Sequence, residues 1–365
     1  MDTESFVLDV VDVVEETADA HSIVLARPAE GAEAFNYTPG QFLTLAVPSD
    51  QTGLAARCYS LSSSPIDDGP LVVTVKRTDG GYASNWICDN LRAGDTIRVL
   101  PPSGIFTPKD LDADLLLFAG GSGVTPIISI ARTALARGTG RVVVFYANRD
   151  ERSVIFAEAF RELAAEHSDR LLVVHWLESV QGLPSQDQLR EFARQYSSFT
   201  SFCCGPAPFM KAVSQALREL EFPRDRRHQE KFVSLGGNPF GDVEEIRAAE
   251  ATLAEADDAN EPDDASDTPA VAGPVSVEVE LDGESWAFDD WDGRTLLLDF
   301  LESKGVPAPF SCREGNCSAC ACVVLEGDLT MKHNDVLDEA DLSDGIRLSC
   351  QGQAATETLK ISYNG

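Results

Sequence analysis

The sequence is short of basic side chains: its 365 residues include 29 Lys and Arg against 60 Asp and Glu, for a formal net charge of −31. Proteins that bind nucleic acids contact phosphates through clustered Lys and Arg. This composition therefore argues against DNA or RNA binding. Because so acidic a chain repels phosphates, we expect any nucleotide site to lie at a local group of Arg and Lys.

Long apolar segments are lacking as well. No apolar run approaches the ~18 residues needed to cross a bilayer, and Met1–Ser5 lacks the basic and apolar regions of a signal peptide. We therefore expect a cytoplasmic protein without stable membrane insertion. Since a disulfide framework needs an oxidising compartment, the scattered Cys58, Cys88, Cys203 and Cys204 are expected to be free thiols.

Four further cysteines have the spacing of a plant-type [2Fe–2S] site. Cys312, Cys317 and Cys320 follow the pattern C-x4-C-x2-C, and Cys350 comes thirty residues later. Four thiolates must converge on two irons, so three come from one loop and the fourth from the returning chain. Zinc sites usually use two separate pairs of ligands, which this spacing does not supply. We expect Cys322, two residues further on, to be buried in a strand.

The N-terminal segment, residues 1–110, has the pattern of an antiparallel β-barrel. Short apolar or alternating runs such as Phe6–Val14 and Leu71–Lys76 are separated by Pro, Gly and Asp residues. Closely spaced strands of this kind predict a small closed barrel.

One predicted strand of this barrel carries a set of ligand-binding side chains. Arg57 can form a forked contact with a phosphate, Tyr59 can stack on a planar ring, and Ser60 can hydrogen-bond a ring nitrogen. Lys76 follows on a later strand, and Gly81–Ser84 opens a helix whose N–H groups favour a pyrophosphate. A single Tyr or Arg of this kind is more often packing or solvated surface, but the ordered set favours a nucleotide.

Residues 111–240 change to alternating strands and helices. Leu115–Ala119 is fully apolar, as in a buried parallel strand, and leads into a glycine loop, Gly121–Pro126. This alternation predicts a doubly wound parallel sheet, with ligands at the carboxyl ends of its strands. Pro126 replaces the last glycine of the G-x-G-x-x-G pattern, so an ordinary tight turn is the alternative interpretation.

The second predicted strand of this sheet ends at a pair of arginines. Arg149 and Arg152 could hold a 2′-phosphate, whereas Asp150 or Glu151 between them could accept a hydrogen bond from a free 2′-hydroxyl. The choice between NADH and NADPH therefore stays open at this point.

The C-terminal third of the chain changes composition twice. Residues 241–273 are acidic and rich in Ala, Pro and Thr, which predicts a largely disordered linker. Residues 274–365 then show a hairpin about Asp282–Gly283, a helix, the cysteine loop and further strands. This is the order of a β-grasp ferredoxin, an α+β domain.

Taken together, these motifs resemble the ferredoxin–NADP reductase superfamily, in particular the class with a C-terminal plant-type ferredoxin. The resemblance covers nearly the whole chain apart from the linker, which is longer than the resemblance leads us to expect. Val75–Thr78, Tyr146–Asp150 and the cysteine loop resemble most the reductase components of 3-ketosteroid 9α-hydroxylases. The reductases of phenylacetyl-CoA oxygenases are near relatives.

The resemblance implies how the two nucleotides are bound. The FAD ligands it implies are Arg57, Tyr59, Ser60, Val75, Lys76, Gly81, Tyr82, Ala83, Ser84 and Phe232. The nicotinamide nucleotide would contact Gly121, Ser122, Gly123, Thr125, Pro126, Arg149, Arg152, Gly205 and Pro206. The candidate catalytic residues are Tyr59, Ser60, Cys204 and Glu230, although the sequence from His228 to Phe232 departs somewhat from the family pattern.

The resemblance also implies an electron path from NADH, or NADPH, through FAD and the [2Fe–2S] cluster to a Rieske-type terminal oxygenase. We expect the reductase itself to be a monomer. Three alternatives remain: the reductase of a phenylacetyl-CoA-type oxygenase, a stand-alone diaphorase or redox sensor, and a non-enzymatic module with zinc at the cysteines. The terminal substrate leaves no trace in the sequence, because a reductase does not bind it.

Overall fold

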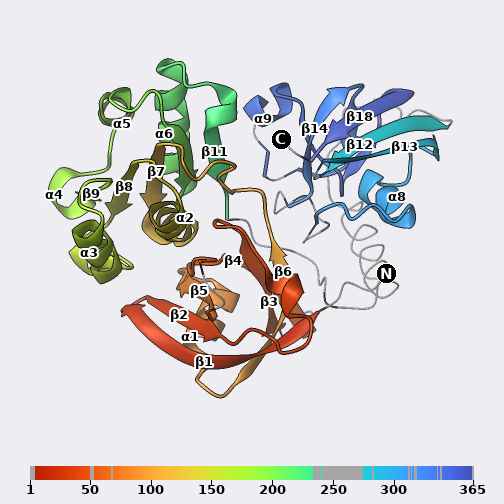
Figure 1. The fold of residues 1–365 in the computed structure, drawn as a ribbon. Helices are drawn as coiled ribbons and strands as arrows, with labels where there is room; N and C mark the ends of the chain where they lie inside the picture. The colour runs from red at the N-terminus through yellow and green to blue at the C-terminus, as the bar shows by residue number, and fades with distance from the viewer. Residues whose placement is uncertain are drawn as a thin grey trace. The chain divides into compact units, whose positions relative to one another are not determined.

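The structure, a computed structural model, describes residues 5–49, 53–66, 69–232, 240, 274–281, 283–310, 313, 315, 319–334, 336–337 and 339–363. The predicted linker, residues 241–273, lies outside these residues, as do Cys312 and Cys317 of the predicted cluster site. The described part contains an antiparallel barrel, a parallel sheet with helices and a mixed ferredoxin sheet (Figure 1), which confirms the predicted fold class.

The N-terminal barrel has six strands in the order β4-β3-β6-β1-β2-β5. Side chains that alternate along these strands fill its interior: Ile23, Leu25 and Val73 are fully buried. A bridge between Leu61 and Val73 joins the segment after β4 to β5. Helix α1 packs against β5 and contributes Ile87 to the same core. The elements are β1 (Phe6–Thr17), β2 (Ala20–Leu25), η1 (Ala32–Phe35), β3 (Phe42–Ser49), β4 (Gly53–Ser60), β5 (Leu71–Lys76), α1 (Tyr82–Asn90) and β6 (Thr96–Ser103).

The second region is a five-stranded parallel sheet in the order β11-β10-β7-β8-β9. Every residue of β7 is buried, because one apolar cluster with α2 and α3 covers one face of the sheet and a second with α5 and α6 covers the other. The strands are β7 (Leu115–Gly120), β8 (Val142–Asn148), β9 (Leu171–Leu177), β10 (Thr200–Cys204) and β11 (Arg227–Glu230). The helices are η2 (Gly121–Gly123), α2 (Val124–Arg137), η3 (Glu151–Ser153), α3 (Ala157–Glu166), α4 (Glu178–Gln181), α5 (Gln186–Arg194), α6 (Ala207–Glu219) and η4 (Arg224–Arg226).

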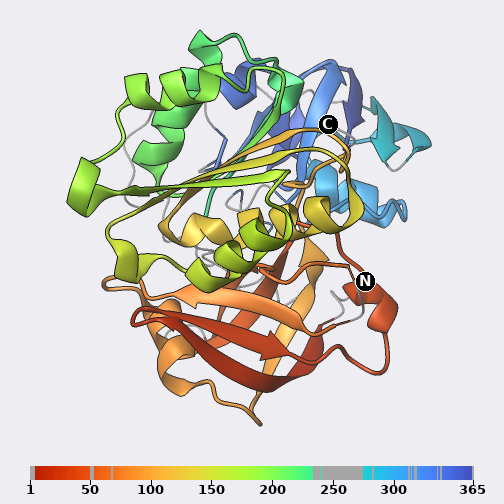
Figure 2. The ribbon, with the colours of Figure 1, turned by 60° about the vertical axis from the view of Figure 1, so that its left-hand side comes forward.

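Helix α2 lies where the barrel and the parallel sheet meet. Figures 1 and 2 show it between β7 and the barrel strands, with its N-terminus directly after the glycine loop. Helix α2 therefore contacts both the parallel sheet and the barrel.

The ferredoxin region has a mixed sheet in the order β13-β12-β18-β14-β16, in which β12 and β18 run parallel. Trp291 and Leu301 are fully buried in its core. The elements are β12 (Val275–Leu281), β13 (Glu284–Trp291), α8 (Leu297–Ser303), β14 (Ala321–Glu326), β15 (Leu329–Met331), α9 (Glu339–Ser343), β16 (Ile346–Leu348), β17 (Gly352–Ala354) and β18 (Thr358–Ser362). Across all the residues that the structure describes, no helix has the length and apolarity to span a membrane.

Candidate functional site

The end of β4 presents the predicted flavin-binding side chains. Ser60 is 3% exposed, and Tyr59 is partly buried against the barrel core. Burial raises the pKa of Tyr59, and the neighbouring Arg57 only partly opposes this effect. Tyr59 is therefore a neutral phenol at physiological pH, with a ring that can stack on a planar group and a hydroxyl that can donate.

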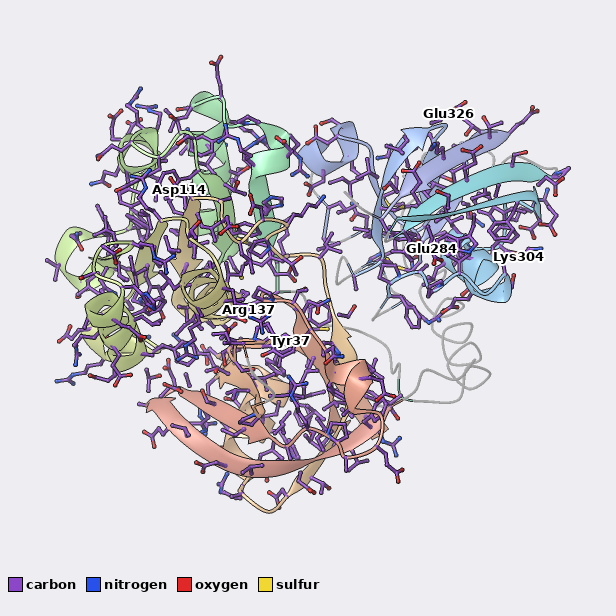
Figure 3. All side chains as sticks on the ribbon, viewed as in Figure 1. Tyr37, Asp114, Arg137, Glu284, Lys304 and Glu326 are labelled. Carbon is purple, nitrogen blue, oxygen red and sulfur yellow. The ribbon has the colours of Figure 1, made fainter. Side chains whose placement is uncertain are left out.

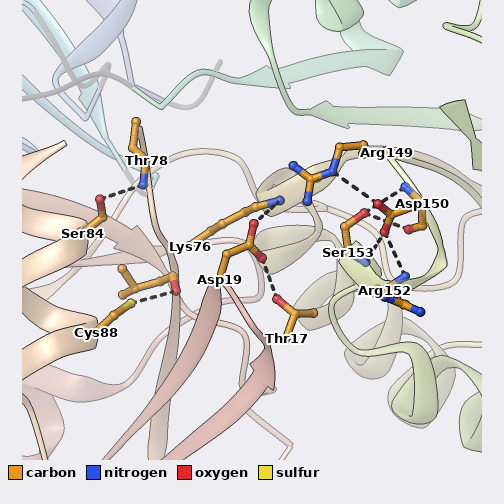
Figure 4. Close-up of polar contacts among 12 residues, drawn as sticks. Thr17, Asp19, Lys76, Thr78, Ser84, Cys88, Arg149, Asp150, Arg152 and Ser153 are labelled. Carbon is orange, nitrogen blue, oxygen red and sulfur yellow. Dashed lines mark hydrogen bonds and ion pairs between the residues drawn. The ribbon is translucent and has the colours of Figure 1, made fainter. Parts of the chain in front are cut away.

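The start of α1 lies near the end of β4, since Ala83 and Tyr59 belong to the same apolar cluster. Gly81 is the N-cap of the helix, and a Cβ atom there would lie 2.8 Å from the Thr78 Cβ and 3.1 Å from the Ser84 Oγ. The Thr78 N–H donates to that same Ser84 Oγ at 3.1 Å. Lys76 forms an ion pair with Asp19 at 3.6 Å (Figure 4). A helix start without a Cβ suits the pyrophosphate of a nucleotide.

On the parallel-sheet side, two loops pack backbone against backbone. A Cβ on Gly123 would lie 2.2 Å from the carbonyl oxygen of Cys204, and a Cβ on Gly205 would lie 2.9 Å from the backbone of Gly120. Only glycines allow this approach of the loop after β7 to the loop after β10. Gly121 has φ +52°, and no atom lies within 4 Å of the position its Cβ would take. This open space above the glycine loop fits a nicotinamide nucleotide.

Tyr146 on β8 is hydrogen-bonded to the glycine loop, a role that was not predicted from the sequence. Its hydroxyl lies 3.2 Å from the carbonyl oxygen of Gly121 and 3.3 Å from that of Ile155. The side chain is fully buried, and burial raises its pKa, so the hydroxyl keeps its proton. A tyrosine inside an otherwise apolar buried strand requires such a polar partner, and this requirement was the available signal. The Thr125 hydroxyl bonds to the Ser122 carbonyl at 3.2 Å and is buried.

The segment after β8 uses Asp150 as a local cap. Its Oδ1 accepts from the backbone N–H groups of Arg152 and Ser153, both at 3.0 Å. Its Oδ2 lies 3.4 Å from the Nε of Arg149, whose side chain is 69% exposed. In Figure 4 the Arg149 side chain extends toward Lys76 on the barrel side. Asp150 therefore shapes the backbone here and partly neutralises Arg149.

Strand β11 places Glu230 next to Cys204. The two residues are register partners on parallel strands, and both are buried. Burial raises the pKa of Glu230 to about 8, so the carboxyl group is protonated at neutral pH. Burial, with Glu230 as a second cause, also raises the pKa of Cys204. Phe232, two residues after Glu230, is 48% exposed.

Strand β11 was not predicted, because Arg227–Glu230 has no apolar pattern. Its pairing with β10 and the stacking of His228 on Phe202 support it; the two rings are 4.5 Å apart with an interplanar angle of 18°. Burial, aided by Arg224, lowers the pKa of His228 to about 4. The imidazole is therefore neutral, as a ring stacked in an apolar place should be.

The ferredoxin region brings Cys320 and Cys350 into hydrogen-bonded segments. Both thiols are buried, and Ser349 donates from its N–H and from its Oγ to the Cys320 carbonyl, each at 3.1 Å. Gly315 has φ +78°, and a Cβ there would lie 2.8 Å from the His333 carbonyl oxygen. Cys322 is buried in the strand core, where its thiol donates to a backbone carbonyl at 3.5 Å.

Two observations fit an iron–sulfur cluster here. Buried thiols are ligands that suit iron, and the Gln351 amide donates at 2.7 Å to the Arg313 carbonyl, which joins the residue after Cys350 to the residue after Cys312. Arg313 is itself paired with Asp299 at 3.0 Å and stacked 4.1 Å from the Phe310 ring centroid.

Comparison with known proteins matches three families along the chain. Residues 8–107 match an oxidoreductase FAD-binding domain, residues 117–215 an oxidoreductase NAD-binding domain, and residues 279–355 a 2Fe-2S iron-sulfur cluster binding domain. The ferredoxin reductase component of 3-ketosteroid-9-alpha-monooxygenase from Rhodococcus rhodochrous is 52% identical over 99% of this chain and 97% of the relative. The chain belongs to this family of reductase components.

Further comparisons agree with this assignment. The corresponding component of Mycolicibacterium smegmatis is 51% identical over 98% of this chain and 96% of the relative. The solved structure of a phthalate dioxygenase reductase shares the fold, with a TM-score of 0.55 at 23% identity over 98% of both chains. As a member of the family, the chain is an NAD(P)H-dependent oxidoreductase that uses FAD and a [2Fe–2S] cluster.

Proposed function

We propose that this reductase passes electrons from a reduced nicotinamide nucleotide to a Rieske-type oxygenase that acts on a 3-ketosteroid. The observation that carries the proposal is the arrangement of the two proposed nucleotide sites. One compact unit contains both the glycine backbone around Gly123 and the side chains of Arg57, Tyr59 and Ser60. A ferredoxin with buried Cys320 follows in the same chain. Relatives that are 52% and 51% identical over nearly their full lengths are reductase components of 3-ketosteroid-9-alpha-monooxygenase, which supports a steroid oxygenase as the partner.

The proposed domain boundaries follow the sheets. Residues 1–110 form the FAD-binding barrel, 111–240 the nicotinamide-binding region, 241–273 the acidic linker and 274–365 the ferredoxin. The family matches at 8–107, 117–215 and 279–355 fall inside the three folded regions and support this division.

The chemistry of hydride and single-electron transfer belongs to FAD and the iron–sulfur cluster when they are bound. We assign the phosphates of FAD to Arg57, Lys76 and the start of α1 at Gly81–Ser84, and its ring to Tyr59 and Ser60. Val75 would contact FAD through its backbone, and Phe232, which is 48% exposed, would cover the other face of the ring. The aromatic faces would exclude water from the reacting position.

The nicotinamide nucleotide is assigned to the glycine backbone. Gly121–Pro126 and Gly205–Pro206 would receive its nicotinamide half, and Arg149 with Arg152 its adenosine half. Glu230 would hold a proton near the nicotinamide site, since burial raises its pKa to about 8. The cluster is assigned to Cys320 and Cys350, together with Cys312 and Cys317 from the undescribed part of the loop.

The direction of electron flow follows from typical reduction potentials. Plant-type clusters lie at about −400 mV, and Rieske centres at about −150 to +300 mV. Transfer from this ferredoxin to a Rieske oxygenase is therefore downhill.

Reconstitution tests the proposal. The purified reductase, a 3-ketosteroid oxygenase component, NADH and a 3-ketosteroid should together yield hydroxylated steroid in proportion to the NADH consumed. A Cys350→Ser variant should keep NADH-dependent reduction of ferricyanide and lose hydroxylation. If the wild-type enzyme reduces ferricyanide but supports no hydroxylation, it is a diaphorase or serves another oxygenase. The same assay with NADPH measures the nucleotide preference.

A net charge of −31 also supports electrostatic steering of a partner with a positive docking face. Hydroxylation at limiting oxygenase concentration should then slow as salt rises from 0.05 to about 0.5 M, because screening shortens the range of the field. Ferricyanide reduction by the same sample serves as the control for salt effects on the flavin half. Hydroxylation that does not respond to salt contradicts steering.

A further inference from the structure

Helix α2 is joined to the barrel by a row of polar contacts, called here the α2 seam: Ser129, Arg132, Thr133 and Arg137 of the helix against residues 62–66. The Ser129 Oγ donates to the Ser63 carbonyl at 2.6 Å, and the hydroxyls of Thr133 and Ser64 lie 2.6 Å apart. The Arg137 Nη2 donates to the Ile66 carbonyl at 2.7 Å. Figure 3 labels Arg137 at this boundary.

Arg132 is the charged residue in the middle of the seam. Its Nη1 donates to the Ser62 carbonyl at 3.2 Å, and its guanidinium lies 6.0 Å from the Phe156 ring centroid. Burial lowers the pKa of Arg132, while Glu16 on the barrel and Glu162 on α3 act in the opposite direction. Burying a guanidinium is costly unless its donors are hydrogen-bonded, so the bond to the Ser62 carbonyl favours one position of Arg132 between the two regions.

Ser62 is held from the barrel side as well. Its hydroxyl lies 2.8 Å from that of Thr74, which lies 2.8 Å from that of Ser22, and Ser22 donates to Glu16 at 2.6 Å. Thus Ser62, whose carbonyl accepts the hydrogen bond from Arg132, is also held through its hydroxyl by a series of hydrogen bonds to side chains of β5 and β2. This end of the contact cannot easily shift.

A cavity of about 500 Å³ adjoins the middle of the seam. Glu16, Ser22 and Val72 line it from the barrel, and Arg132, Phe156 and Arg161 line it from the parallel-sheet region. The two regions therefore do not pack closely at this pocket. Elsewhere Ala20 and Phe106 of the barrel pack with α2 in one apolar cluster, and the polar contacts of α2 add directional bonds of defined length to this packing.

The two residues of this contact, Ser62 and Arg132, belong to segments that continue into the proposed nucleotide sites. Ser62 lies two residues after Ser60 in the chain, and α2 begins at Val124, directly after the glycines of η2. A rigid helix passes any shift on one side of the seam to the glycine loop. We propose that Arg132 is a positioning residue that sets the distance between the flavin strand and the glycine loop, and thereby the rate of hydride transfer. This inference rests on the proposed placement of FAD at β4 and of the nicotinamide at the glycine loop.

The expected effect is on rate rather than on affinity. A displacement of about 1 Å between reacting groups can slow a reaction by about 100-fold, whereas the atoms proposed to bind the nucleotide are unchanged. Loss of Arg132 should therefore lower the limiting rate of flavin reduction and leave the NADH concentration for half-maximal rate nearly unchanged.

Rapid-mixing measurements on the full-length, FAD-loaded enzyme test this. In Arg132→Met the limiting rate of flavin reduction by NADH should fall by about tenfold or more, and NADH deuterated at the transferred position should slow it further. Arg132→Lys, which keeps the charge and one donor, should recover part of the rate. Arg137→Met is the matched control, because it removes an arginine-to-carbonyl contact at the far end of the same helix.

The control and the stability data separate positioning from folding. A purely structural role predicts a lower melting temperature for Arg132→Met with a flavin-reduction rate and isotope effect equal to those of Arg137→Met, and that result overturns the proposal. If Arg132→Met does not fold, Arg132→Lys and Ser129→Ala are compared with Arg137→Met by the same criterion. Flavin reduction precedes the cluster and the oxygenase, so failed steroid hydroxylation in the wild-type enzyme leaves this test standing. A wild-type enzyme that binds no FAD contradicts the proposed function itself.

Discussion

The barrel and the parallel-sheet region present different kinds of surface to their proposed nucleotides. The barrel offers side chains: Arg57, Tyr59 and Ser60 from one strand end, and Lys76 from another. The parallel-sheet region offers backbone, because a Cβ on Gly123 or Gly205 would collide with the backbone of the neighbouring loop. Binding through side chains can be weakened in steps by substituting one side chain at a time. Binding to closely packed glycine backbone is lost at once when an added Cβ forces the loops apart.

The largest predicted effect on the rate of flavin reduction comes from adding a side chain at Gly123. In Gly123→Ala the new methyl group would lie 2.2 Å from the Cys204 carbonyl oxygen, so one of the two loops must move. We expect flavin reduction by NADH to fall at least about 100-fold, with FAD content unchanged.

Gly121→Ala is the matched control. No atom lies within 4 Å of that Cβ position, and the cost is the φ of +52°, which for an alanine is about 1–2 kcal/mol. A smaller loss of rate than in Gly123→Ala is expected. Equal losses in both variants would show that loop conformation, not close packing of the loops, is what matters.

On the barrel side, a graded loss is expected. Arg57→Lys keeps the positive charge but removes the planar fork that can bind a phosphate through two hydrogen bonds. Fluorescence titration of the apoprotein with FAD should show affinity reduced by about tenfold, and saturating FAD should restore flavin reduction. No change in FAD affinity would remove Arg57 from the site.

Glu230 is a side chain on the backbone side, and it should show a pH dependence. Its folded-state pKa of about 8 lies above the usual 4.5, so the folded protein keeps a proton that the unfolded chain releases. The stabilisation from this proton is fully present below pH 4.5 and is lost as pH rises to about 8. Each pKa unit corresponds to about 1.4 kcal/mol.

The comparison with Glu230→Gln isolates this effect, since the amide has the same shape and does not titrate. The melting temperature of the wild-type enzyme relative to this variant should fall between pH 5.5 and 8.5. A constant difference across that range would mean that Glu230 is ionised throughout.

The smallest effect is expected at Asp150. Asp150→Asn removes the negative charge 3.4 Å from the Arg149 Nε, so Arg149 becomes more available to a 2′-phosphate. Steady-state kinetics should show a KM for NADPH lowered several-fold relative to that for NADH. Glu151→Gln removes a neighbouring charge without altering the cap and serves as the control. An equal change in both variants would indicate general charge neutralisation.

Much of the fold could be predicted, because strong local patterns specify it. The apolar run at Leu115–Gly120, the glycine loop after it and the hairpin about Gly283 each contain enough information to define an element. Strand β11 could not be predicted. Its residues, Arg227–Glu230, have neither apolar periodicity nor β propensity, and pairing with β10 makes them a strand.

The sequence by itself determined which chemical groups are present and in what order: the Arg57–Ser60 set, the glycine loop and the cysteine spacing that ends at Cys350. These are local patterns within short stretches of chain. Only the tertiary structure decided which groups meet. Tyr146 under Gly121, Glu230 beside Cys204, and the α2 seam all join residues distant in sequence, in the seam by 66 to 71 positions. Spacing along the chain carries no record of such contacts, because they arise from the packing of whole elements against one another.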